Sequence, residues 1–511
     1  MGHDTRRAGA ITIGRVDDVT TLNPVLYGDL PTGEVVNRLF DHLVLTDPDG
    51  GYVPGRLLSH WETSGDGLTW DFHLRRAARW HDGRPVTARD ACCSLRTMLD
   101  PATGSPRRAE FLVDGRPPAY EAITPHLLRI SLPAPHAPFL ASLAWRPVIP
   151  AHLYDDGGAI AGNAHNDAPV GSGAFEFESW ERGVELTMRA NLDYHQGRAP
   201  IDSVRWRCFA GREAAVEALL VGSVDYVPGV PPAHVAAIEH DARLSLIRSV
   251  DGSFTFLGFR LHRPPFGDAR VRRALHHAID RERIVATVLR GEGEVAHSAV
   301  IPSSPWHNPD VARYPYDPRR AAELLDAAGW RAADDGVRRD AGANAFEFTI
   351  LTAANDPLKA GAARAIADDL AALGVTAHIE QRPLGELLTQ RAFTGDFEAL
   401  LLGLTPGLDP GFLHGFYHSA MTPPGGWNML GYVDRAVDAL LDSSQRATDP
   451  AERSALVAQA LARVALDTPH VMLFHPASVD AATTALSMPP LPPTPGNRFM
   501  YMHRWSVVRA R

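Results

Sequence analysis

Histidine pairs are the clearest candidates for chemistry in this chain. The sequence holds 23 histidines, of which His276 and His277 are consecutive and must point different ways from a helix. His414 and His418 are four residues apart and would share one helix face, where they could bind a metal ion together. A polar surface face, or a hydrogen bond at the edge of a cleft, is the alternative interpretation of that pair, and we expect no metal.

Other catalytic signatures are missing from the sequence. There is no G-x-S-x-G, H-E-x-x-H, P-loop or G-x-G-x-x-G motif, so the common hydrolase, metalloprotease and nucleotide-binding classes are not indicated. The cysteines Cys92, Cys93 and Cys208 show neither zinc spacing nor a disulfide framework. Cys92 and Cys93 fit the apolar side of a helix capped by Thr87, with Asp90 three residues on. We expect no cofactor.

Composition sets the size of the fold and excludes one class of partner. A chain of 511 residues is too long for one hydrophobic core, so two or three lobes are expected. Hydrophobic residues make up 45% of the chain and charged residues 22%, as in globular proteins. The net charge of −10 and the absence of any basic block argue against nucleic acid as a partner.

The first residues carry no export signal that we can identify. They lack an apolar segment, a small-residue cleavage site and an early cysteine for lipid attachment. No stretch reaches the ~20 apolar residues of a membrane-spanning helix, so no direct membrane span is expected. Either a signal has been removed, and the protein is extracellular or periplasmic and attached to the membrane, or the protein stays in the cytoplasm.

Local patterns indicate alternating strands and helices, which is typical of an α/β protein. The segment 266–289 contains two apolar stripes at helical spacing, with Asp280 suited to capping the second helix. Helices are also expected after Asp317 and Asp449, each followed by proline, and in the alanine-rich segment 361–373. Strands are expected at 254–261, 346–351, 399–402 and 471–474, and loops at 422–426 and 489–493.

The order and wording of several segments closely resemble the family 5 extracellular solute-binding proteins, which serve peptide, nickel and opine ABC importers. These segments are TLNP (21–24), LFDHL (39–43), WDFHL (70–74), WHDGRPVTARD (80–90), PVGSGAF (169–175), NLDY (191–194), FGDARVRRALHHAIDRERI (266–284), YPYDPRRA (314–321) and AGW (328–330). The resemblance covers nearly the whole chain.

This resemblance implies a two-lobed periplasmic-binding-protein-like α/β fold of type II, with an extra subdomain in the first lobe. The first lobe would comprise 1–48, 168–255 and 478–511, the inserted subdomain 49–167, and the second lobe 256–477. A ligand held in the cleft between lobes would shift the protein toward a closed form. The implied function is the capture of a peptide-like or other small amphipathic solute, as a monomer, for an ABC permease if the protein is exported.

One position departs from the peptide-binding pattern of the family. In those members a cleft strand reads approximately Gly-Trp-x-Ala-Asp-x-x-Asp/Glu-Pro, and its first aspartate contacts the terminal amine of the peptide. Here the matching segment 402–410 has Pro406 in place of that aspartate and Gly403 in place of the tryptophan. The amine anchor is therefore missing unless Asp409 or a nearby acid replaces it.

Several further ligand contacts are implied by the same comparison of segments. Aromatic walls with a few polar groups suit a mostly apolar ligand, and an arginine can pair with a ligand carboxylate. For each aromatic residue core packing is an equal alternative, and the arginine is equally suited to a structural ion pair. The candidates are Tyr27, Asp29, Trp145, Arg146, Asp409, Trp427 and Asn428.

An enzyme built on the same fold is the alternative function. A few such proteins in actinobacterial specialised metabolism are cytoplasmic Pictet–Spengler condensing enzymes, and this chain is similar in its arginine-rich composition and its lost amine anchor. That reaction joins an aryl-ethylamine to an aldehyde and needs a carboxylate acid/base but no cofactor. Asp29, Glu34 or Asp409 would supply the carboxylate. Because Lys359 is the single lysine, a lysine Schiff base is not expected.

Overall fold

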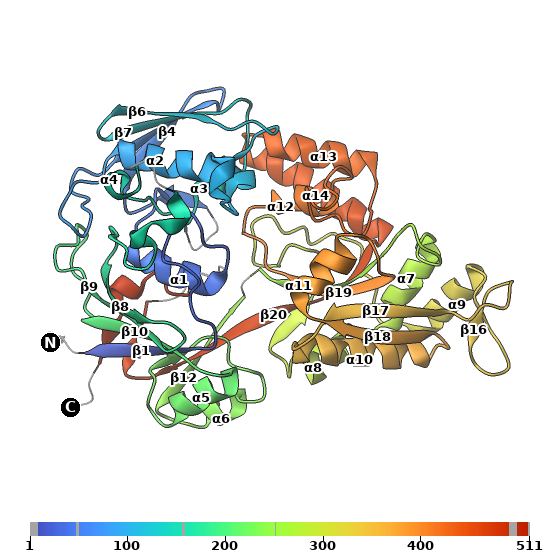
Figure 1. The fold of residues 1–511 in the computed structure, drawn as a ribbon. Helices are drawn as coiled ribbons and strands as arrows, with labels where there is room; N and C mark the ends of the chain where they lie inside the picture. Colours follow the sequence, from blue (N-terminus) through green and yellow to red (C-terminus); the bar gives the residue numbers. More distant parts are fainter. Residues whose placement is uncertain (1–8, 48–50, 156–158, 251, 490–497, 509–511) are drawn as a thin grey trace. The chain divides into compact units, whose positions relative to one another are not determined.

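The computed structural model describes residues 9–47, 51–155, 159–250, 252–489 and 498–508. The chain divides into two compact units, which are described separately (Figure 1). Unit 1 comprises Met1–Ser249 and Ser478–Arg511, and unit 2 comprises Val250–Ala477. The chain therefore passes from one unit to the other twice.

The main sheet of unit 1 is built around strand β1 (Ala10–Arg15). Four of its six residues are buried, so it runs through the core. β1 is parallel to β10 (Ser203–Cys208) and to β11 (Tyr226–Val227). Beyond β10 the sheet continues with antiparallel β9 (Glu185–Ala190) and β8 (Phe175–Glu181), while β11 pairs with Ala481 and Ala482 of the long strand β20 (His470–Thr483).

Helix α1 (Leu30–Leu39) follows β1 after an irregular segment. Asp29 caps it, because its Oδ1 accepts a hydrogen bond from the Thr32 N–H at 2.8 Å, and Pro31 lies in the first turn. The other elements of the parallel part of the unit are α5 (Arg212–Leu220), α6 (Val235–Glu239) and β12 (Leu244–Val250).

Residues 51–155 of unit 1 contain a second, antiparallel sheet. Its strand order is β4 (Leu58–Thr63), β5 (Thr69–Leu74), β7 (Leu127–Ser131) and β6 (Ala119–Thr124). Helix α2 (Ala88–Leu99) begins with the expected capping box, in which the Thr87 N–H donates to Asp90 Oδ2 at 2.7 Å. Cys93 is buried and Cys92 half-buried. The assignment of 49–167 as an inserted subdomain stays a prediction.

Shorter elements complete unit 1. They are the strands β2 (Val44–Thr46), β3 (Tyr52–Pro54), β21 (Leu486–Ser487) and β22 (Ser506–Val507), the helices α3 (Phe139–Leu143) and α4 (Ala151–Tyr154), and the 3-10 turns Pro101–Thr103, Arg108–Phe111, Ile160–Gly162, Ala164–Asn166 and Met502–Arg504.

Unit 2 is a sheet covered on both faces. Its strand order is β18 (Thr376–Arg382), β17 (Glu347–Ala353), β19 (Ala399–Leu404), β13 (Phe254–Phe259) and the first half of β20, with β14 (Gly293–Val295) also paired to β20. β17 is parallel to β18 and β19, whereas β13 is antiparallel to β19. All six residues of β13 are buried, as expected for a strand with a core on each side.

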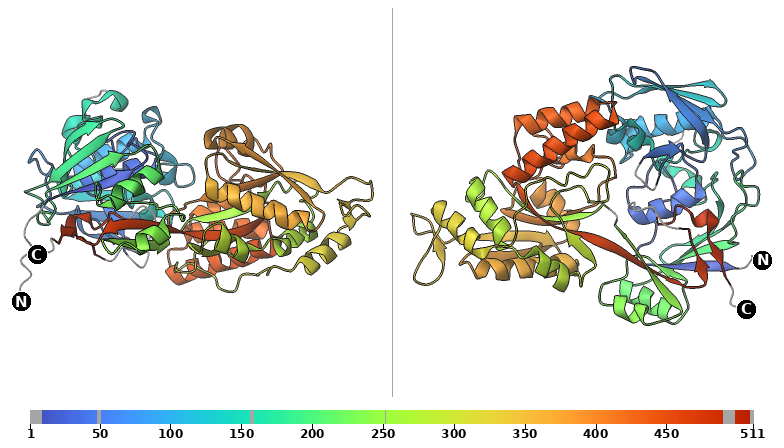
Figure 2. Two further views of the ribbon diagram at one scale, coloured as in Figure 1. Left: turned by 90° about the horizontal axis from the view of Figure 1, so that it is seen from below. Right: turned by 180° about the vertical axis from the view of Figure 1, so that it is seen from behind.

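Alternate residues of β13 belong to different cores. Leu257 and Phe259 pack with helices α7 (Ala269–Ala278) and α10 (Pro357–Ala371), whereas Phe254 and Phe256 pack on the opposite face. That opposite face is covered by α12 (Phe412–Tyr417), α13 (Arg435–Arg446) and α14 (Pro450–Asp467); Figures 1 and 2 show α13 and α14 side by side. The remaining elements are α8 (Arg281–Thr287), α9 (Pro318–Ala327), β15 (Arg331–Ala332), β16 (Arg338–Arg339), α11 (Leu384–Glu386) and a π-helical turn, Leu387–Ala392.

Most local predictions are confirmed. Asp280, Asp317 and Asp449 each cap a helix through a side-chain oxygen. The alanine-rich helix begins at Pro357, four residues earlier than predicted, because Asp356 caps it and accepts from the Lys359 N–H at 3.0 Å. The predicted strand 471–474 is part of the longer β20, and most of the predicted loop 489–493 lies outside the described residues.

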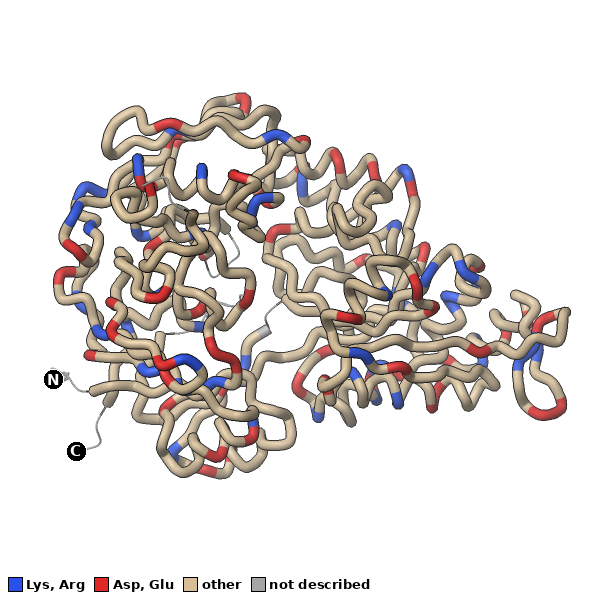
Figure 3. Tube along the Cα trace, viewed as in Figure 1, with Lys and Arg blue, Asp and Glu red and all other residues tan. Residues whose placement is uncertain are grey.

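Residues of both charge signs are spread along the trace of each unit (Figure 3). Among the described helices, none combines the length and the apolar character that a membrane crossing requires.

Candidate functional site

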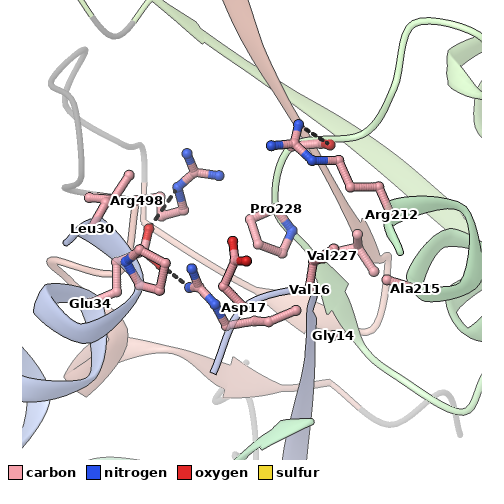
Figure 4. A pocket seen from close by; sticks show the side chains of 13 residues that line it. Gly14, Val16, Asp17, Leu30, Glu34, Arg212, Ala215, Val227, Pro228 and Arg498 are labelled. Carbon is pink, nitrogen blue, oxygen red and sulfur yellow. Dashed lines mark hydrogen bonds and ion pairs between the residues drawn. The ribbon is translucent and has the colours of Figure 1, made fainter. Parts of the chain in front are cut away.

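A pocket opens in unit 1 at the carboxyl ends of the parallel strands β1 and β11 (Figure 4). Ligands of open α/β sheets bind at this edge, outside the carboxyl ends of the strands. The first turns of α1 and α5 supply the other walls, and the volume is about 190 Å³. The lining residues are Gly14, Arg15, Val16, Asp17, Leu30, Pro31, Glu34, Arg212, Ala215, Val227, Pro228, Gly229 and Arg498.

Glu34 is the central polar residue of this pocket. It lies on α1, is 2% exposed, and forms ion pairs with Arg15 at the end of β1 and with Arg498, whose Nε lies 3.2 Å from Glu34 Oε1. Asp480 of β20 extends the network, since its Oδ1 lies 2.5 Å from Arg498 Nη1 and accepts the Gly229 N–H at 2.9 Å. Asp480 Oδ2 accepts a hydrogen bond from the Tyr226 hydroxyl.

The network balances its own charge. Two arginines face two carboxylates, and the charge-assisted hydrogen bonds hold all four side chains in place. Burial, together with the nearby Arg498 charge, lowers the pKa of Arg15 to about 10, so that Arg15 is still charged at neutral pH. Burial and the Asp480 carboxylate raise the pKa of Tyr226, which therefore remains a hydroxyl donor. The network forms a fixed polar wall.

The rim of the pocket differs from this wall. Asp17 and Arg212 are exposed there and carry opposite charges. Leu30 is 49% exposed, and Val16 and Pro228 add further apolar surface. A pocket with one fixed polar wall, an apolar side and charges at its rim suits a small molecule that has both polar and apolar groups.

The structure brings two of the predicted site residues of unit 1, Asp29 and Glu34, to this pocket or its border. Asp29 precedes the lining residue Leu30, but its carboxylate caps α1 and also accepts from the Thr20 hydroxyl at 2.9 Å. Glu34 is engaged by Arg15 and Arg498. Both carboxylates thus already have partners within the fold.

Tyr27, Trp145 and Arg146 gather at a different place in unit 1. The Tyr27 hydroxyl donates to the Trp145 carbonyl at 3.4 Å, and Tyr27 is buried. Trp145 is half-buried, and its indole N–H donates to Thr46 Oγ1 at 3.1 Å. Arg146 pairs with Glu110, with 2.5 Å between Nη2 and Oε2. None of the three lines the pocket.

Unit 2 has its own carboxyl-end edge, formed by β17, β18 and β19. Lys359 lies there, on the first turn of α10, and forms an ion pair with Asp356. A Cβ on Gly403 of β19 would lie 3.3 Å from Lys359 Cε, so the glycine leaves room for the lysine side chain. Thr405 follows β19, with its hydroxyl oxygen 2.9 Å from Ser253 Oγ. The next residue, Pro406, stands where the peptide-binding pattern has its amine-binding aspartate.

The remaining predicted residues of unit 2 have distinct environments. Both carboxylate oxygens of Asp409 contact Arg453. Asn428 is buried, and its side chain holds a turn by bonding the N–H and the carbonyl of Tyr432 at 2.9 and 2.8 Å. Trp427 is 43% exposed and packs edge-on against Phe393, with 5.6 Å between ring centroids. Part of the Trp427 indole is thus open to solvent, and its role as a ligand contact stays a prediction.

Comparison with known proteins decides the family. Residues 51–423 match the model of the bacterial extracellular solute-binding proteins, family 5, middle region. The chain belongs to family 5 of the bacterial extracellular solute-binding proteins. Among its relatives this family 5 protein is 29% identical over 479 residues to protein XP55 of Streptomyces lividans, covering 92% of this chain and 84% of that one. It is 26% identical over 484 residues to the oligopeptide-binding protein AppA of Bacillus subtilis, covering 92% and 87%.

Solved structures share the fold of this family 5 protein. The ABC transporter substrate-binding protein CtaP of Listeria monocytogenes superposes with a TM-score of 0.89 at 22% identity, covering 99% of this chain and all of that one. NikA of Brucella suis, solved in complex with Fe(III)-EDTA, gives a TM-score of 0.88 at 22% identity, covering 98% and 100%. The predicted family and the predicted type II two-lobed α/β fold are confirmed.

Proposed function

We propose that this family 5 protein captures a peptide-like or other small amphipathic solute and delivers it to the permease of an ABC importer. The observation that carries the proposal is the pocket at the carboxyl ends of β1 and β11, with its polar wall around Glu34 and its apolar side at Leu30. In this proposal the protein acts outside the cytoplasm, as the family name implies, and it acts as a monomer.

The relatives support the solute-binding role by what their names state. AppA of Bacillus subtilis is an oligopeptide-binding protein. Di/tripeptide-binding protein 2 of Pseudomonas aeruginosa is 26% identical over 467 residues. NikZ of Campylobacter jejuni was solved with Ni(L-His) and superposes with a TM-score of 0.81. Because these ligands differ in kind, the solute of this chain has to be inferred from the residues of its own site.

The carboxyl-end edge of unit 2 argues for a solute that needs no free terminal amine. Pro406 provides no carboxylate at the position where peptide-binding members are expected to have one. Asp409, the nearest alternative, is held by Arg453 through both of its oxygens. The Asp356 carboxylate at this edge is likewise engaged, because it forms an ion pair with Lys359.

The test compares matched pairs of short peptides, each with a free or an acetylated amino terminus, by isothermal titration calorimetry. We expect the acetylated peptide of each pair to bind within about 3-fold of the free one, because no carboxylate anchor is lost. A buried carboxylate anchor would favour the free amine by about 2–5 kcal/mol. Such a preference would refute the solute class, whereas binding of neither form of any pair would refute peptide capture.

A further inference from the structure

A cluster of histidine and aspartate side chains lies where α12 packs against α13 in unit 2. His414 is on α12 and His418 is its C-cap residue, while Asp438 and Asp442 are four residues apart on α13. His414 Nε2 lies 3.2 Å from Asp442 Oδ1, and His418 Nε2 lies 3.4 Å from the same oxygen. The two imidazole rings stack with their centroids 4.5 Å apart.

We propose that His414, His418 and Asp442 form a binding site for a divalent transition-metal ion of the Zn²⁺ class. Ligands at 2.0–2.1 Å from a tetrahedral zinc ion are separated by about 3.3 Å, which both histidine-to-aspartate distances match. In this arrangement two imidazole nitrogens and one carboxylate oxygen lie close enough together to bind a single ion of this kind. Imidazole ligands favour zinc, copper and nickel over magnesium or calcium.

Asp438 is placed to support His418 from behind. Its Oδ1 lies 4.0 Å from His418 Nδ1, and it is fixed by the Ser419 N–H at 2.8 Å and by the Ser419 hydroxyl. Histidines that bind a metal through one ring nitrogen usually donate the other N–H to such a carboxylate. Asp438 is therefore a positioning residue, distinct from the three ligands.

Metal binding requires one local change. The Ala420 N–H donates to His418 Nδ1 at 3.1 Å, so the neutral ring carries its proton on Nε2. When the metal ion takes Nε2, that proton leaves to solvent and Nδ1 takes one up, leaving the net charge of the ring unchanged. The Ala420 hydrogen bond is then lost and Nδ1–H turns toward Asp438. This exchange lowers the affinity compared with a fully preformed site.

The site lies next to the segment that presents Trp427. The Trp427 N–H donates to the Gly415 carbonyl at 2.8 Å, and the Asn428 side chain donates to the His418 carbonyl at 3.2 Å. A metal ion joining α12 to α13 would therefore also fix the backbone to which this segment is attached.

A second group of possible ligands provides a matched control. His60, Glu62 and His73 lie on β4 and β5 of unit 1, with the two rings stacked at 4.1 Å. Here His60 Nε2 lies 3.7 Å from Glu62 Oε1, and His60 and Glu62 are exposed. Removing this histidine pair changes the same number of imidazoles as removing His414 and His418.

The experiment titrates Zn²⁺ into the full chain by calorimetry, after EDTA treatment and without any solute. We expect one principal site in the unchanged protein, an affinity at least about 10-fold weaker in the double variant His414→Gln/His418→Gln, and an unchanged affinity in His60→Gln/His73→Gln. If the double variant fails to fold, Asp442→Ser, at a half-exposed side chain, replaces it with the same expected loss.

Three outcomes would overturn the proposal: no Zn²⁺ binding by the unchanged protein, equal affinity in the His414/His418 variant, or a loss confined to the His60/His73 variant. Because solute is absent, a negative result leaves the solute-binding proposal intact.

Discussion

Arg453 of α14 holds Asp409 by a two-point ion pair, with 2.8 Å between Nη1 and Oδ2 and 2.6 Å between Nη2 and Oδ1. Both side chains are more than nine-tenths buried. This geometry gives Asp409 a structural role in unit 2: it links the segment after β19 to the first turn of α14. Both carboxylate oxygens thus contact Arg453, and the role of Asp409 in ligand binding stays a prediction.

Asp409→Asn is expected to destabilise unit 2. The substitution leaves the buried Arg453 charge without its counter-ion, which costs about 3–5 kcal/mol of unfolding free energy. Urea unfolding followed by circular dichroism measures the loss, with the two units allowed to unfold separately. Asp396→Asn, which breaks exposed pairs with Arg263 and Arg391 in the same unit, should leave the midpoint nearly unchanged. Equal midpoints for the two variants would contradict the structural role.

Glu34→Gln is the corresponding test in unit 1. Its buried carboxylate pairs with both Arg15 and Arg498, so removing the charge leaves Asp480 as the one carboxylate of the network against two arginines. We expect a loss of about 3–5 kcal/mol in unfolding free energy. The control is Glu239→Gln, which breaks an exposed pair with Arg248 and should have little effect. A Glu34→Gln protein as stable as its control would show that the network is dispensable.

The segment comparison implies that Trp427 contacts the ligand, so Trp427→Ala is expected to weaken solute binding while leaving stability nearly unchanged. The half-exposed indole offers a large aromatic face, and truncating such a contact typically costs about 1–2 kcal/mol of binding free energy, or roughly 5–30-fold in Kd. Calorimetry with the tightest peptide of the acetylated series provides the measurement. Tyr316→Ala, at a ring that is also 43% exposed in unit 2, is the control. Similar affinities for both variants would remove Trp427 from the binding surface.

His470 makes the stability of unit 2 depend on pH. Burial lowers the pKa of His470 to about 4, whereas the unfolded chain has a value near 6.5. The folded state therefore keeps the ring neutral, and its contribution is complete above pH 6.5 and lost as the pH falls toward 4. The loss amounts to about 3 kcal/mol.

The substitution His470→Gln isolates this effect. The difference in unfolding free energy between the unchanged protein and the variant should shrink by about 3 kcal/mol between pH 7 and pH 4. Chemical unfolding at a series of pH values records this difference. A difference that stays constant across the range would show that His470 titrates normally in the folded protein.

The helices could be predicted from the sequence because their signals are local. Asp280, Asp317 and Asp449 each lie within three residues of the backbone group that they cap. The alanine-rich segment 361–373 indicates the start of its helix too late, because the start signal is the Asp356–Pro357 pair, which lies before the alanine-rich residues. The predicted strand 471–474 covers only part of β20. The second half of β20 belongs to unit 1, where it pairs with β11.

The pocket was largely beyond sequence reasoning. Glu34 was named as a candidate carboxylate, but Arg15 and Arg498, from opposite ends of the chain, become its neighbours only in the folded unit. One signal was present in the sequence. Arg15 ends a buried strand and Asp17 follows it, and residues at the carboxyl ends of parallel strands are common ligand-binding positions. Trp145 and Arg146 were predicted from segment comparison alone; in the structure they contact Thr46 and Glu110, and their role in ligand binding stays a prediction.

Blocking the pocket of unit 1 tests the central claim most directly. Leu30→Trp places an indole at a lining residue that is 49% exposed, and Leu192→Trp makes the same change at a residue of unit 1 that is 70% exposed and lies outside the pocket. Each protein is incubated with a peptide hydrolysate, desalted and weighed by native mass spectrometry. We predict a retained small molecule on the unchanged protein and on Leu192→Trp, and none on Leu30→Trp. Equal retention by Leu30→Trp, or no retention by the unchanged protein, would contradict solute capture at this pocket.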